Sequence, residues 1–181
     1  MRTLRRPGGK PSLSDTQAVD PSHARAYCIF LLSRRDYSAS ELRKKMKGRG
    51  YLEEAIAPVV DDLLASNTIN DRRYGTNVVA YRARRGQGPV RIRNELRKAG
   101  VAAEDVEAAV AGETEGQAEG NAPDFVKRAR EVRTRKFGPE IPKDRKERAK
   151  QARFLQYRGF SNDHIRAALE GVLEDGEPDQ S

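Results

Sequence analysis

Residues 92–110 read IRNELRKAGVAAEDVEAAV, and the apolar pattern around Gly100 in this stretch occurs three times in the chain. When Gly50, Gly100 and Gly159 are aligned, apolar residues recur four positions before and one and six positions after each glycine: Met46, Leu96 and Leu155; Tyr51, Val101 and Phe160; Ile56, Val106 and Ile165. A repeat of about fifty to sixty residues made of short helices indicates an array of small helical units. We therefore predict an all-α fold, an elongated array of three tandem three-helix repeats, and a long binding surface instead of one deep pocket.

The composition favours several thin cores and an anionic partner. Of the 181 residues, 36% are hydrophobic and 34% are charged, and the net charge is +8. A basic protein attracts nucleic acid or an acidic protein surface. The single cysteine, Cys28, excludes an intrachain disulfide and indicates a reducing compartment. Neither a membrane-spanning run nor a secretory signal is visible, so we expect a soluble cytoplasmic monomer with no membrane partner.

Helix-capping and helix-breaking residues divide the chain into parts. Asp20-Pro21 is a typical helix start, and Gly86-Gln87-Gly88-Pro89 is a sharp break inside the second repeat. The predicted parts are a disordered basic arm (1–19), three-helix repeats (20–69, 70–111 and 124–173), an acidic Gly-rich linker (112–123) and an acidic tail (174–181).

Basic residues occupy equivalent positions in the first two repeats. Arg43 and Arg93 lie seven residues before the aligned glycine, and Lys47 and Arg97 lie three residues before it. On a helix these positions share one flank beside the apolar residues, so stacked repeats would join them into one basic stripe. Arg91 and Lys98 widen the stripe in the second repeat.

The third repeat departs from this pattern. Ala152 and Gln156 stand at the equivalent positions, although residues 127–153 hold twelve basic and four acidic residues. The predicted partner-binding residues are therefore Arg43, Lys47, Arg91, Arg93, Arg97, Lys98, Arg153 and Arg158. The alternative for each is an ordinary solvated helix face. As a group they suit phosphate, which basic side chains contact without reading base identity.

Residues for catalysis or metal binding are sparse. His23 and His164 are far apart in the sequence, and Cys28 falls on an apolar helical face, where a buried thiol is expected. Asp61-Asp62 and Asp71 are the only carboxylates that suggest a divalent metal, but adjacent helical residues point about 100° apart and Asp71 suits a helix start. We therefore predict no catalytic residue, no metal and no cofactor.

Several motifs in order resemble the RecX family of regulatory proteins. The similarity runs over residues 22–173, with Gly75 and the length of the 112–123 linker as departures from the usual pattern. Its residues are Ser38, Glu41, Leu42, Gly50 and Tyr51; Asn70 to Tyr74; Gly88 to Ile92; Glu95 to Val101; and Phe154, Leu155 and Arg158 to Ser161.

The resemblance implies a cytoplasmic modulator of the RecA recombinase in DNA repair and the SOS response. Such proteins consist of tandem three-helix repeats, lie along the groove of the RecA–single-stranded DNA filament, and usually inhibit its ATPase, strand exchange and co-protease activities. The implied partners are RecA and single-stranded DNA, with double-stranded DNA left open. A stand-alone nonspecific basic DNA-binding protein is the alternative, and a nuclease using Asp61 or Asp71 is a remoter one.

Overall fold

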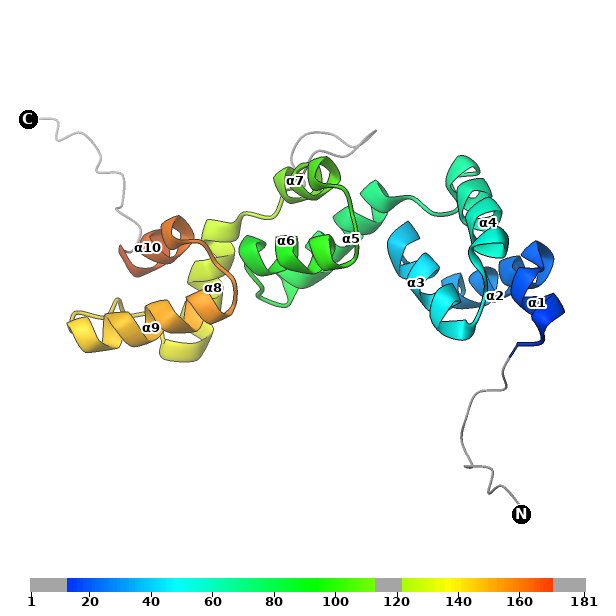
Figure 1. The fold of residues 1–181 in the computed structure, drawn as a ribbon. Helices are drawn as coiled ribbons and strands as arrows, with labels where there is room; N and C mark the ends of the chain where they lie inside the picture. Colours follow the sequence, from blue (N-terminus) through cyan, green and yellow to red (C-terminus); the bar gives the residue numbers. More distant parts are fainter. Residues whose placement is uncertain (1–12, 113–121, 171–181) are drawn as a thin grey trace, which may run out of the picture. The chain divides into compact units, whose positions relative to one another are not determined.

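The computed structural model describes residues 13–112 and 122–170, and these residues form ten helices and no strand (Figure 1). This confirms the all-α prediction. The helices are α1 (Asp15–Val19), α2 (Pro21–Leu32), α3 (Ala39–Arg49), α4 (Glu53–Ala65), α5 (Asp71–Arg84), α6 (Pro89–Lys98), α7 (Ala103–Ala111), α8 (Phe125–Phe137), α9 (Arg145–Tyr157) and α10 (Asn162–Glu170). The chain divides into two compact units, Met1–Asn70 and Asp71–Ser181.

The first unit packs α2, α3 and α4 around one core. Its fully buried side chains include Leu42, Met46, Ile56 and Leu63, and burying each contributes about 1.5–3 kcal/mol. The thiol of Cys28 lies in the same core, as predicted, and burial raises its pKa to about 11. Protonated and enclosed, this thiol serves packing.

The helix α1 corrects the prediction of a disordered arm at 1–19. Ser14 caps α1 in a capping box with Gln17, and the amide of Leu52 donates to the carbonyl of Ala18 at 2.9 Å. The partly buried Leu13 packs against the core of the first unit. Residues 13–19 are therefore held by contacts with α4 and its preceding turn, which composition alone does not indicate. Residues 1–12 lie outside the described residues.

The three aligned glycines end the middle helix of each repeat in the same way. Gly50, Gly100 and Gly159 have φ of 108°, 78° and 88°, in the left-handed region that side chains disfavour. The next residue then donates its amide to the carbonyl five positions back, from Tyr51 to Met46, Val101 to Leu96 and Phe160 to Leu155, at 3.1–3.2 Å. The glycine alignment that predicted three repeats thus marks the same backbone turn in each repeat.

The second and third repeats share one core in the second unit. Leu96, Val106, Phe125 and Leu155 are buried in the same cluster, although they come from α6, α7, α8 and α9. The shared core differs from the separate thin cores expected from composition. Residues 113–121 of the predicted linker and the predicted tail at 174–181 lie outside the described residues.

Two glycines bring the repeats of the second unit into backbone contact. The amide of Gly88 donates to the carbonyl of Arg158 at 2.9 Å, and that of Val90 donates to the carbonyl of Gly159 at 3.0 Å. A Cβ atom on Gly88 would lie 2.3 Å from the backbone of Gly159. The sharp break predicted at 86–89 is therefore also the junction between the second and third repeats.

Some apolar or aromatic side chains on the helices face solvent. Leu64 on α4 is 39% exposed and Tyr81 on α5 is 46% exposed, and Ala149 on α9 is exposed. Gln151, the polar residue at an otherwise aliphatic position of the third repeat, is buried instead. It packs beside Arg133, so the third repeat uses a polar contact where the other two use apolar ones.

Candidate partner-binding surface

The predicted stripe residues of the first repeat form ion pairs with the following helix. Arg43 contacts Asp61 at 2.8 Å, and Lys47 contacts Glu53 at 2.7 Å, both across the α3–α4 interface. The four side chains keep between 33% and 67% of their surface exposed. Exposed pairs of this kind contribute about 0.2–1 kcal/mol each, so an incoming anion can replace the carboxylates at small cost.

In the second repeat, the two equivalent basic residues also form ion pairs with the following helix, but they share one acidic residue. Arg93 and Arg97, one turn apart on α6, contact the two carboxylate oxygens of Glu107 on α7 at 2.8 and 3.3 Å. In both repeats, the basic pair on the middle helix therefore faces carboxylates of the following helix. Arg91 and Lys98 are exposed elsewhere on α6.

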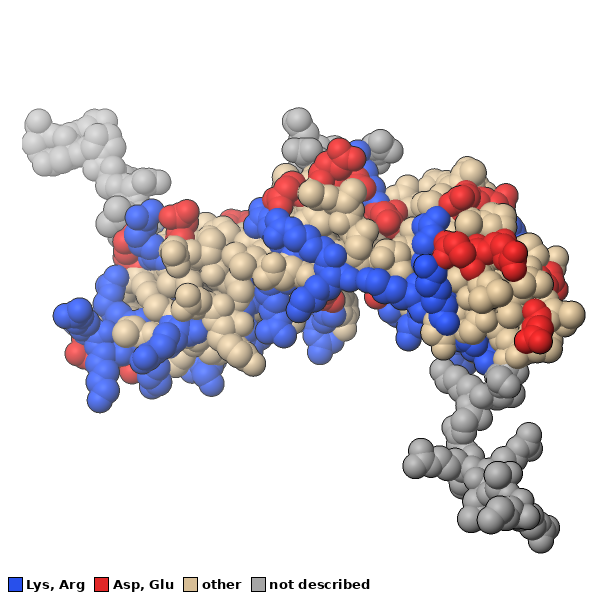
Figure 2. All heavy atoms as spheres, viewed as in Figure 1, with Lys and Arg blue, Asp and Glu red and all other residues tan. Residues whose placement is uncertain are grey.

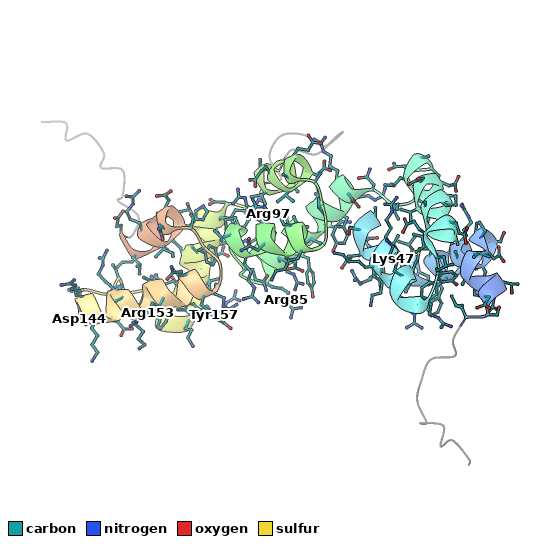
Figure 3. The ribbon with its side chains drawn as sticks, in the orientation of Figure 1. Lys47, Arg85, Arg97, Asp144, Arg153 and Tyr157 are labelled. Atoms are coloured by element: carbon teal, nitrogen blue, oxygen red, sulfur yellow. The ribbon has the colours of Figure 1, made fainter. Side chains whose placement is uncertain are left out.

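The two predicted residues of the third repeat have different surroundings. Arg153 is exposed on α9 and forms no ion pair within residues 13–112 and 122–170 (Figure 3). The Arg158 guanidinium lies 5.3 Å from the centre of the Phe154 ring, and its Nη1 donates to the carbonyl of Arg85 at 3.5 Å. The structure therefore places Arg158 beside the second repeat and leaves Arg153 in solvent.

Arg158 belongs to a basic pocket that the sequence did not reveal. The pocket has a volume of about 420 Å³ and lies where α5, α8 and α9 meet. Its charged lining is all basic, and its apolar lining comes from α8 and α9; the lining residues are Arg85, Gly86, Val132, Arg135, Lys136, Phe154 and Arg158. We call this set the junction pocket. In the view of Figure 2, basic side chains gather over the α9 region and acidic ones over α7.

The junction pocket draws its cations from residues far apart in the sequence. Arg85 follows α5, Arg135 and Lys136 end α8, and Arg158 follows α9. The glycine pair Gly88 and Gly159 was visible in the sequence, but not that these glycines touch. The contact that links these elements is therefore visible only in the fold.

One basic residue of the segment 127–153 is structural. Arg133 is 3% exposed, and its guanidinium donates to the carbonyls of Glu140 at 2.8 Å and Pro139 at 3.0 Å. A further contact reaches Gln151 at 3.4 Å. Burial lowers the pKa of Arg133, and this side chain holds the loop between α8 and α9. It is unavailable to a partner.

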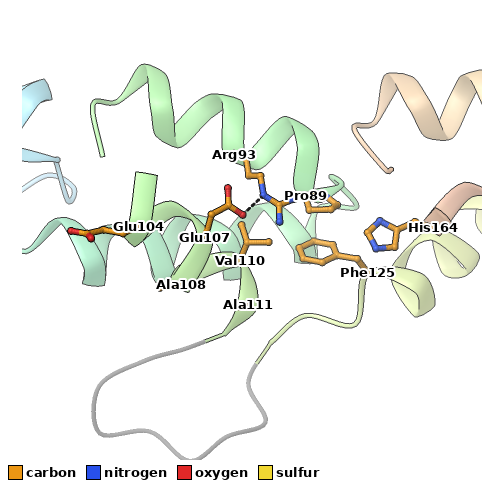
Figure 4. Close-up of a pocket in the computed structure, with 9 residues that line it drawn as sticks. All are labelled: Pro89, Arg93, Glu104, Glu107, Ala108, Val110, Ala111, Phe125 and His164. Atoms are coloured by element: carbon orange, nitrogen blue, oxygen red, sulfur yellow. Dashed lines mark hydrogen bonds and ion pairs between the residues drawn. The ribbon is translucent and has the colours of Figure 1, made fainter. Parts of the chain in front are cut away.

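A second pocket, of about 430 Å³, has mixed charge (Figure 4). Arg93 and Glu107 form their ion pair at its edge, and the rings of Phe125 and His164 lie 5.9 Å apart within it. Glu104 adds a further carboxylate to the lining. Burial lowers the pKa of His164 and favours its neutral form. With two acids against one arginine, this pocket suits an anionic partner less than the junction pocket does.

The residues considered for catalysis take structural contacts. Asp61 pairs with Arg43 and Asp62 with Arg25. His23 Nδ1 lies 2.7 Å from the Tyr51 hydroxyl, and His164 lies 2.9 Å from Ser161 Oγ at the start of α10. Within residues 13–112 and 122–170, no three His, Cys, Asp or Glu side chains gather as a metal site would need.

Comparison with known proteins places the chain in a family. Models of the first, second and third three-helix domains of RecX match residues 24–63, 70–110 and 124–169. The chain belongs to the RecX family. RecX proteins named regulatory proteins include one from Halorhodospira halophila, 39% identical over 82% of this chain and 88% of its own length, and one from Ectopseudomonas mendocina, 38% identical over 86% and 98%.

Solved RecX structures share the fold. The crystal structure of a regulatory protein RecX superimposes with a TM-score of 0.67 at 23% identity, over 83% of this chain and 73% of that one. The crystal structure of RecX from Lactobacillus salivarius superimposes with a TM-score of 0.68 at 20% identity, over 83% of this chain and 95% of that one. The three matched domains confirm the three-helix repeats predicted from the aligned glycines. Among the described helices, none is both long and apolar enough to span a membrane.

Proposed function

We propose that this chain is a non-catalytic, cytoplasmic regulator that binds the RecA–single-stranded DNA filament along its groove as a monomer. It inhibits the ATPase, strand exchange and co-protease activities of RecA, and so acts in DNA repair and the SOS response. The observation that carries this proposal is the match of all three RecX domain models in order along the chain.

The basic faces of the repeats support a filament as the partner. A filament offers phosphates and acidic protein faces at regular intervals, and several repeats can engage it at once. Each exposed contact is weak and screened by salt, but linked contacts strengthen one another through effective concentration. We propose that a chain bridging neighbouring RecA protomers restrains the motions between protomers that accompany ATP turnover.

Exchange of ion pairs explains how the stripe residues serve this function. In the free chain Arg93 and Arg97 are held by Glu107 on the surface of the second unit. A phosphate accepts charge-assisted hydrogen bonds from arginine at least as well as a carboxylate does. The pairs therefore hold the guanidinium groups in place until the filament displaces Glu107.

The proposal is tested by comparing binding to RecA filaments with binding to bare DNA. The full chain is titrated onto single-stranded DNA carrying RecA and a non-hydrolysable ATP analogue, and onto the same DNA without RecA, at one salt concentration. We expect tighter binding to the filament. Equal affinity for both, falling steeply with salt, would instead identify a stand-alone basic DNA-binding protein.

A further inference from the structure

The junction pocket concentrates positive charge without a carboxylate to balance it. Arg85, Arg135, Lys136 and Arg158 line it, and no acid is among its lining residues. Arg85 interacts with the hydroxyl and ring of Tyr81, and Arg158 with the ring of Phe154. These contacts position the guanidinium groups, and neither guanidinium forms an ion pair with a carboxylate of residues 13–112 or 122–170. Like charges gathered in an open pocket repel one another, and a bound anion relieves that repulsion.

The fold holds this pocket in shape before any ligand arrives. The Gly88 amide fixes the carbonyl of Arg158, and a Cβ on Gly86 would lie 2.6 Å from a methyl carbon of Val132. The close packing of these glycines sets Arg85 of the second repeat against α8 and α9 of the third. The pocket therefore forms only when both repeats are packed together. Because its backbone is already fixed, binding costs little conformational entropy.

An exposed aromatic residue stands next to the pocket. Tyr157 is 79% exposed at the end of α9 (Figure 3). It lies three residues after Phe154, on the same side of α9 as that ring, and it directly precedes Arg158 in the chain. Lys136 lies 5.5 Å from the centre of the Phe154 ring. Aromatic rings among cations are typical of surfaces that bind single-stranded nucleic acid, where bases stack on rings and phosphates meet basic side chains.

We propose that the junction pocket binds a backbone phosphate of single-stranded nucleic acid and that Tyr157 stacks on an adjacent base. This inference rests on the proposed function, because it assigns the DNA contact of the filament to the second unit. A single strand is the ligand because its bases are free to meet a ring, whereas those of a duplex are paired and stacked inside. An acidic protein segment would use the cations but not the exposed ring.

Fluorescence anisotropy with a labelled oligothymidine and a hairpin duplex, both without RecA, tests the pocket and the ring separately. We expect Arg85→Gln combined with Arg135→Gln to weaken the binding of both DNAs. The slope of log affinity against log salt should fall by about 0.7 for each phosphate of the single strand that the variant no longer neutralises. Tyr157→Ala is expected to lower the affinity for the single strand about tenfold and to change the affinity for the duplex little. Tyr157→Phe keeps the ring and is expected to bind as wild type does.

The matched control is Arg166→Gln on α10, which removes a charge from the same unit at a side chain that is 69% exposed and paired with Asp163. It is expected to leave the affinity for single-stranded DNA nearly unchanged, and thermal unfolding checks that every variant is folded. The proposal is overturned if the pocket variants bind DNA as tightly as Arg166→Gln does, or if Tyr157→Ala keeps the full affinity for single-stranded DNA. The proposal is also overturned if polyglutamate binds as tightly as single-stranded DNA, and if this binding is lost in the pocket variants but not in Tyr157→Ala. Inhibition of RecA by the wild-type chain is measured separately, so a failed pocket leaves the proposed function standing.

Discussion

The second unit contains two basic surfaces that differ in how their charge is balanced. On α6, Arg93 and Arg97 share the carboxylate of Glu107. In the junction pocket, the cations Arg85, Arg135, Lys136 and Arg158 have no carboxylate among the lining residues. The spacing of basic residues therefore predicts where positive charge lies, but not whether a neighbouring helix neutralises it. We infer that the α6 surface exchanges partners on binding, whereas the junction pocket is ready to accept an anion.

The largest effect is expected where the junction itself is broken. A Cβ on Gly88 would lie 2.3 Å from the backbone of Gly159, so Gly88→Ala forces the two repeats apart. We expect the free energy of unfolding of the second unit to fall by about 3 kcal/mol, as measured by urea denaturation. Gly48→Ala on α3 is the control, because nothing lies within 4 Å of its added Cβ; it is expected to stabilise the helix slightly. Equal stabilities for the two variants would show that the close contact is not needed.

A smaller loss of stability is expected when Arg133, the buried arginine of the basic segment 127–153, is replaced. Arg133→Met removes the hydrogen bonds to the carbonyls of Pro139 and Glu140, so we expect about 2 kcal/mol of destabilisation. Arg135→Met, two residues on and exposed in the junction pocket, is expected to change stability by less than about 0.5 kcal/mol. Thermal unfolding measures the stabilities and anisotropy the affinity for single-stranded DNA. A weaker affinity with full stability in the Arg133 variant would reverse the roles assigned to the two residues.

Charge reversal on α6 tests whether the paired surface takes part in regulation. Arg93→Glu with Arg97→Glu places like charges beside Glu107 and repels phosphate, so we expect the concentration for half-inhibition of the RecA ATPase to rise about tenfold. Circular dichroism should show unchanged helicity, because both sites are on the surface of α6. Unchanged inhibition by a folded variant would remove the stripe from the proposed interface.

The smallest effect is expected from freeing the same two arginines. Glu107→Gln leaves Arg93 and Arg97 without their carboxylate and costs less than about 1 kcal/mol of stability. We expect affinity for single-stranded DNA to rise about threefold at low salt, with a steeper dependence on salt. Titrations at several salt concentrations measure both. A fall in affinity would mean that Glu107 helps to form the binding surface.

Residues close in the sequence were the ones whose roles could be predicted. The turns at Gly50, Gly100 and Gly159 follow from local backbone chemistry, as does the N-cap Asp20, which accepts from the amide two residues on. Short-range hydrogen bonds leave a pattern at fixed spacing. The three repeats were therefore accessible from the sequence, and so was the shared helix flank of the basic pair within each of the first two repeats.

Contacts between distant elements were the part that could not be predicted. Glu107 reaches Arg93 because α7 folds back along α6, and Arg85 meets Arg158 because Gly88 and Gly159 touch. Neither contact has a fixed sequence spacing. Arg133 shows the same limit, since a buried arginine in a basic segment looks like its exposed neighbours until the loop at 138–144 is placed.

The RecA ATPase on single-stranded DNA, titrated with the full chain at fixed salt, tests most directly whether this chain regulates the filament. We predict inhibition at ratios of chain to DNA far below those needed to coat the strand, because a regulator acts on filaments and not on free phosphates. Inhibition that begins only when the DNA is saturated would contradict the account, and would leave a basic protein that competes with RecA for DNA.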